Sequence, residues 1–189
     1  MINFFTNILC FLIIFESYNY GINFVNNQYV PADYVVMADE ITEKVEAKLT
    51  KRYNMRTIGT IGGMADRVNM LGLSFQIHGP LSKDKLRRIL IDCIEEFLTP
   101  INANEKLRPF LKTYPYTVEG LIIEIFVVDD TGKKVYDPNI MLAETFQGEL
   151  KYRLVDKDTK FGYKSTEKED YETALKIVQN EKNKTNLKN

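Results

Sequence analysis

The chain has 189 residues, of which 44% are hydrophobic and 27% charged, and such values are ordinary for a single globular domain. They exclude an intrinsically disordered chain, a collagen-like fibre and a polytopic membrane protein. Twenty-five basic and 26 acidic residues give a net charge of −1, which provides no overall field to recruit nucleic acid. Two cysteines and one histidine are too few for a disulfide scaffold or a zinc site, and no motif indicates a cofactor.

The N-terminal segment from Ile2 to Phe15 is mostly apolar and ends at Glu16. A membrane-spanning helix needs about 20 apolar residues, whereas this shorter run is typical of a secretory signal peptide. No Lys or Arg precedes it, and no small-x-small cleavage site follows it. We therefore expect a signal peptide over residues 1–21, a tether over 22–31 and an exported protein. The alternatives are an uncleaved anchor, which would be the only membrane contact, and a cytoplasmic protein that folds this segment into its domain.

Residues 32–180 are expected to form one domain, followed by a disordered tail over 181–189. From residue 31 to residue 53, apolar residues recur at steps of three and four, which predicts a helix. Residues 68–78 alternate between apolar and polar side chains, which predicts a strand with one wet face. The next helix begins after Ser82, its expected N-cap, carries an apolar face from Leu86 to Phe97, and is expected to stop at Thr99-Pro100.

The second half of the chain adds strands and a last helix. Residues 117–128 are β-branched and apolar, as in a central strand. Even-numbered apolar positions from 140 to 154 predict either one long strand or two strands broken at Gly148, and residues 167–178 have a helical pattern. This order predicts an α+β fold, a two-layer sandwich of three or four mainly antiparallel strands with helices on one face.

Three glycines, Gly59, Gly62 and Gly63, lie in the segment between the first helix and the first strand, which we expect to be a loop. Glycine-rich loops can hold phosphate with backbone amides when they connect a strand to a helix N-terminus. Here a helix precedes the glycines and a strand follows, so the order favours a helix-to-strand turn over a phosphate site.

Three further residues are candidates for catalysis. His78 is the only imidazole available for acid–base chemistry near neutral pH, and Asp66 could accompany it beside the glycines. Glu144 falls between Leu142 and Phe146 on the predicted apolar side of its strand, where a carboxylate must be paired, protonated or at an edge. The alternatives are an exposed histidine at a strand end and a solvated edge strand.

No complete catalytic arrangement emerges from these residues. The sequence therefore favours a non-enzymatic protein that binds another protein or a component of the cell envelope. Two alternatives remain: a small hydrolase-like enzyme with a site near His78 and the segment 59–63, and a carrier with a small-ligand cavity between sheet and helices.

Overall fold

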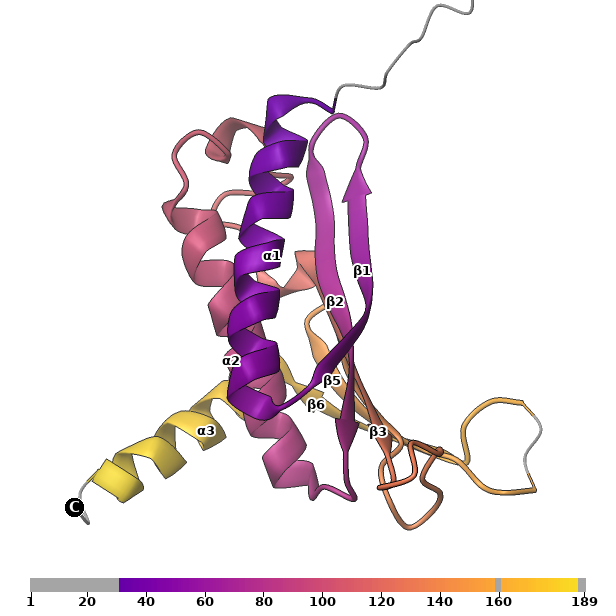
Figure 1. Ribbon diagram of the computed structural model, residues 1–189. Coiled ribbons are helices and arrows are strands. Elements are labelled where there is room, and N and C mark those ends of the chain that lie inside the picture. The colour runs from indigo at the N-terminus through magenta and orange to yellow at the C-terminus, as the bar shows by residue number, and fades with distance from the viewer. Residues whose placement is uncertain (1–30, 159–160, 187–189) are drawn as a thin grey trace, which may run out of the picture. The chain divides into compact units, whose positions relative to one another are not determined.

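A computed structural model describes residues 31–158 and 161–186. The expected signal peptide, and the tether up to residue 30, lie outside the described residues. The elements, in chain order, are α1 (Asp33–Tyr53), β1 (Arg56–Met64), β2 (Val68–His78), α2 (Lys83–Ala103), β3 (Leu121–Val128), β4 (Leu142–Phe146), β5 (Glu149–Leu154), β6 (Ser165–Asp170) and α3 (Tyr171–Asn186) (Figure 1). Two short 3-10 turns, Arg108–Phe110 and Val118–Gly120, lie between α2 and β3.

The described strands form one six-stranded mixed sheet whose spatial order follows the chain from β1 to β6. Among the described strands, β2 and β3 are the one parallel pair, and α2 provides the crossover that such a pair needs. The α+β class is therefore confirmed, whereas the expected count of three or four strands is wrong. The two extra strands are the outermost ones: β1 is the glycine segment expected to be a loop, and β6 occupies residues assigned partly to the last helix.

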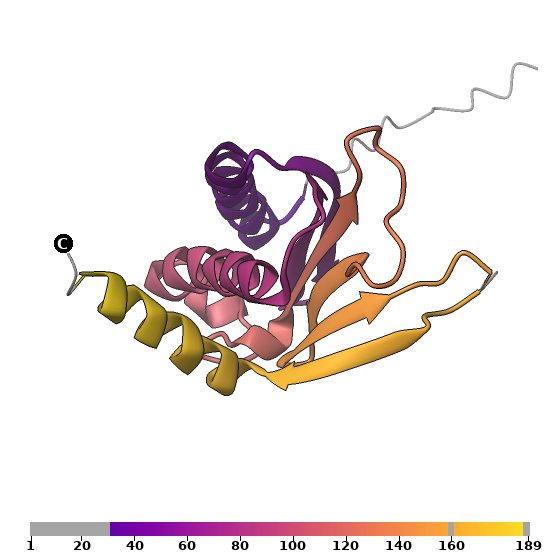
Figure 2. The ribbon, with the colours of Figure 1, turned by 90° about the horizontal axis from the view of Figure 1, so that it is seen from below.

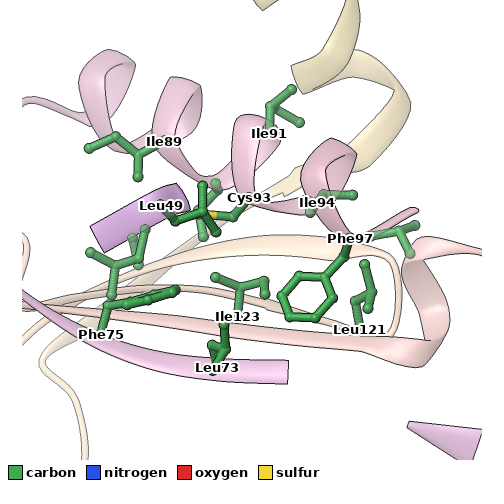
Figure 3. Close-up of a cluster of buried hydrophobic side chains, with 14 of the residues drawn as sticks. Leu49, Leu73, Phe75, Ile89, Ile91, Cys93, Ile94, Phe97, Leu121 and Ile123 are labelled. Carbon is green, nitrogen blue, oxygen red and sulfur yellow. The ribbon is translucent and has the colours of Figure 1, made fainter. Parts of the chain in front are cut away.

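The three described helices lie on the same side of the sheet (Figure 2). Leu73 and Phe75 of β2 and Ile123 of β3 point toward α2, where Cys93 and Phe97 pack against them (Figure 3). Each of these five side chains is fully buried. Burial raises the pKa of the Cys93 thiol far above its ordinary value, so this cysteine is an inert core residue, as its position in the helical pattern predicts.

Helix α2 extends one turn beyond its predicted end. Its N-cap is Ser82 as expected, whose hydroxyl accepts from the Lys85 amide at 3.3 Å. Pro100 does not stop the helix, because the following turn is stabilised from two sides. Ile101 is fully buried, and the side-chain amide of Asn102 exchanges two hydrogen bonds with the backbone of Tyr116, at 2.9 and 2.7 Å.

The final elements also differ from their predicted bounds. The 140–154 segment forms two strands joined at Gln147 and Gly148, both with positive φ, as in a two-residue hairpin. Helix α3 begins at Tyr171 rather than at residue 167 and continues to Asn186, through part of the expected tail. In the described part of the chain, no helix is both long enough and apolar enough to span a membrane.

Candidate functional site

The structure separates His78 from Asp66. Asp66 lies in the turn that precedes β2, and His78 is the last of the 11 residues of this strand, so roughly 35 Å separates them at about 3.3 Å per residue. The Nδ1 atom of His78 lies 3.0 Å from the carbonyl oxygen of Asp129, and Asp66 is paired with Arg67 at 2.9 Å. His78 and Asp66 are therefore too far apart to act as an acid–base pair.

The glycine segment is not a loop. Gly59, Gly62 and Gly63 are all within β1 and pair with β2 in an antiparallel register. A turn into a second strand follows them, and no helix N-terminus lies after them to complete a phosphate site. The strand signal in this segment comes from its β-branched residues, which favour strands. These residues are Thr57, Ile58, Thr60 and Ile61.

Glu144 lies inside the sheet on β4, and not on an edge strand. Its neighbours Ala143 and Thr145 face the helices and are fully buried, so the predicted apolar side of this strand is wrong. The Glu144 carboxylate lies on the opposite face, where the Arg153 guanidinium donates to it from Nε at 2.9 Å. This ion pair satisfies the carboxylate. Within the described residues, no group of three His, Cys, Asp or Glu side chains is placed to hold a metal ion.

The first edge of the sheet has the features of a binding site. β1 pairs with β2 on one side, and no described strand lies beyond it. No charged residue and no proline occurs between Arg56 and Asp66. Ile58, at a register shift in the ladder, leaves 45% of its surface exposed. A nine-residue strand therefore presents unpaired backbone groups without side chains that oppose pairing.

A groove of about 270 Å³ runs along this edge between α1 and β1. Figure 1 shows α1 alongside the hairpin formed by β1 and β2. The Tyr34 hydroxyl, near the start of α1, donates to the Ala65 carbonyl at 2.9 Å and fixes the hairpin tip against the helix. The strand lines the groove with uncharged residues, namely Thr60, Ile61, Gly62 and Met64.

The helical wall of this groove is acidic. Asp39, Glu43 and Glu46 line it from α1, and we call these three residues the acidic wall. None of them forms an ion pair with another residue in the parts of the chain that the structure describes. The lining of the groove is therefore negatively charged, and no Lys or Arg among the described residues lines it or pairs with the acidic wall.

A larger groove, of about 580 Å³, lies between α1 and α2. Two lysines and two glutamates line it, and of these Lys48 pairs with Glu96, which also accepts from Arg52 at 2.6 Å. Partial burial works to raise the pKa of Glu96, but the hydrogen bonds from Lys48 and Arg52 outweigh it and lower the pKa. Within the described part of the chain, the lining of this groove has no excess of either charge that would select a ligand.

The chain matches no protein-family model, no curated protein and no solved structure. The site is therefore defined by its geometry: an uncharged edge strand beside an acidic helix. The sequence contains the signals for both parts, because β-branched residues surround the glycines of β1 and the acidic wall has helical spacing. If the glycine segment is interpreted as a loop, no edge strand is expected there. The sequence alone therefore does not predict an edge strand beside the acidic helix.

Proposed function

We propose that the protein is a non-enzymatic binding module that takes an extended segment of another protein along β1 by strand addition. In this mode, the backbone of the ligand hydrogen-bonds to a free sheet edge, and neighbouring pockets receive alternate side chains. The observation that carries the proposal is the edge of β1, which has no charged side chain after Arg56 and an uninterrupted register from Gly59 to Gly63, with a groove beside it. The predicted class of function, binding of a protein or envelope component, is narrowed here to a protein segment.

The composition of β1 supports this proposal. Soluble proteins protect exposed edges with charges, prolines, short strands or bulges that turn the edge away. Along β1, the register shifts near Ile58 and Met64 leave an uninterrupted stretch from Gly59 to Gly63. A Cβ at Gly59 would meet nothing closer than 3.9 Å, so packing does not demand glycine there. Small side chains instead leave the edge accessible to a second backbone.

The test uses the full-length protein and three eight-residue peptides. In each peptide, Thr or Val alternates with one other residue, which is Lys, Gln or Glu. Binding is measured by fluorescence anisotropy, and the tightest peptide is then made in two N-methylated forms, one for each set of alternate backbone nitrogens. Strand addition to one edge uses only one set, so one methylated form loses binding and the other keeps it. Equal effects of the two forms, or no binding by any peptide, would overturn the proposal.

Export is a second part of the proposed function, and it is supported by the apolar run at residues 2–15 of the sequence. An exported binding module meets its partner outside the cytoplasm, at the cell envelope or beyond. The intact mass of the native protein from extracytoplasmic fractions tests this. A mass that lacks the first 15 to 25 residues supports export; the full-length mass in the cytoplasm alone contradicts it.

A further inference from the structure

We infer that the segment bound along β1 is cationic, with Lys or Arg at alternate positions that face α1. This inference rests on the proposed strand addition and specifies the ligand of that same groove. It depends on the acidic wall, whose three carboxylates line the groove without a cationic partner among the described residues.

The spacing of the acidic wall fits an extended chain. Asp39, Glu43 and Glu46 are four and three residues apart, which places them on one helix face at intervals of about 6 and 4.5 Å along the axis. Side chains on one face of a strand recur about every 6.7 Å. Because α1 lies beside the β1–β2 hairpin (Figure 1) and the groove separates α1 from β1, successive inward side chains of an added strand would reach successive carboxylates. A pattern of two or three basic residues at every second position fits this arrangement.

The strand side of the groove suits long basic side chains. Met64 is partly buried, its side chain lies beside Gly62, and it presents apolar surface to the groove. The aliphatic stem of a lysine or arginine can cover such surface while its charged end reaches a carboxylate. An acidic side chain in the same place would face like charges, and an apolar one would leave the carboxylates without partners.

The same charges oppose a second copy of this chain as the occupant. Antiparallel pairing of β1 with β1 of another copy would place both α1 helices on the same side of the joined sheet. The two acidic walls would then lie on either side of the junction. Repulsion between these like charges disfavours the pairing of two copies. A cationic segment from a different protein has no such conflict.

The experiment compares the Lys, Gln and Glu peptides at low ionic strength. We expect the Lys peptide to bind at least tenfold tighter than the Gln peptide and the Glu peptide to bind weakest. We expect the advantage of Lys to shrink at about 1 M salt, where the Debye length falls to about 3 Å. If the Gln or Glu peptide binds as tightly as the Lys peptide and shows the N-methyl pattern, the cationic preference is wrong while strand addition stands.

A set of protein variants tests whether the preference for the Lys peptide arises from the acidic wall. The triple variant Asp39→Asn, Glu43→Gln and Glu46→Gln is expected to bind the Lys peptide about tenfold more weakly, because each exposed pair contributes a fraction of 1 kcal/mol. It should bind the Gln peptide unchanged, which also shows that it is folded. The matched control removes three exposed carboxylates elsewhere, by Glu40→Gln, Glu105→Gln and Glu172→Gln. Equal losses in both triple variants would overturn the assignment to this groove.

Discussion

The two edges of the sheet are built in opposite ways. β1 has nine residues, and no charge follows its first residue, Arg56. β6 has six residues, and its last four, from Glu167 to Asp170, are all charged. Charged side chains along a short strand are a recognised protection against edge-to-edge pairing. The same fold therefore protects one edge with charges and leaves the other without them, and the proposed strand addition at β1 rests on this difference.

The protected edge is also attached to the core by ion pairs. Nε of Arg87 on α2 donates to both carboxylate oxygens of Glu169 on β6 at 2.8 Å, and the two side chains are only 8% and 9% exposed. The Tyr152 hydroxyl donates to the same carboxylate at 3.0 Å. β1 has no buried ion pair of this kind within the described residues. One edge is thus attached to α2 by a buried ion pair, and the other has no such attachment among the described residues.

The largest expected effect is on the β6 side. Arg87→Ala would leave Glu169 buried without its cation, which we expect to lower the free energy of unfolding by about 3–5 kcal/mol. Urea unfolding followed by circular dichroism measures the change. The control is Lys83→Ala, which removes the more exposed pair with Glu167 and should cost less than about 1 kcal/mol. Similar losses in the two variants would contradict the assigned role of the buried pair.

The second prediction compares glycines of β1 and β2. A Cβ at Gly72 would lie 1.8 Å from the Ile122 carbonyl oxygen, so Gly72→Ala must push two central strands apart. We expect it to destabilise the protein by about 3 kcal/mol, at the upper end for overpacking. Gly59→Ala meets only Ser74 at 3.9 Å, and we expect it to change stability by less than about 0.5 kcal/mol. A large loss of stability in Gly59→Ala would mean that glycine is needed in β1 for packing, and not to keep the edge accessible to a ligand.

The third prediction concerns a variant that adds charged side chains to β1, the kind of protection that β6 already has. Ile58→Lys together with Thr60→Lys places two charges on β1, at positions that are exposed. We expect binding of both the Lys and the Gln peptide to fall at least tenfold, or about 1.4 kcal/mol, with stability unchanged within about 0.5 kcal/mol. The control, Ser165→Lys with Thr166→Lys, adds the same charge to β6. Equal losses from both double variants would show that charge alone, and not the edge, controls binding.

The smallest effect is expected at the groove between α1 and α2. Because the pKa of Glu96 is lower in the folded protein than its ordinary value of 4.5, the ion pairs stabilise the fold above that value. This contribution is lost as the pH falls through the folded pKa. Solvent screening limits it to less than about 1 kcal/mol. Glu96→Gln should flatten the corresponding part of the acid-side stability curve, and an unchanged pH dependence would contradict the pairing.

The sequence predicts the central part of the fold better than its edges. The apolar face from Leu86 to Phe97 identifies α2, and the alternation in β2 identifies which side faces the core, because burial imposes both patterns. β6 is exposed on nearly every residue, so it lacks the alternation that burial produces. β1 is obscured by its glycines. In β4, Leu142 is buried on the face of the sheet away from the helices. The apolar pattern therefore predicts the wrong orientation for this strand, and it places Glu144 on the wrong face.

The candidate site was only partly predictable for the same reason. A binding edge must have an unpaired side, so it lacks the periodic apolar pattern that marks a core strand. The acidic wall is visible in the sequence at helical spacing, but its position beside β1 depends on the pairing of β1 with β2. The separation of His78 from Asp66 likewise depends on β2, because Asp66 precedes this strand and His78 is its last residue.

Amide hydrogen exchange of the full-length protein, with and without the Lys peptide, tests strand addition most directly. In an edge strand, alternate amides point away from the neighbouring strand, and they exchange readily unless a further strand covers them. With saturating peptide, we predict that exchange at these β1 amides slows at least tenfold, while exchange across β6 is unchanged. Binding without new protection in β1, or equal protection at both edges, would contradict the account.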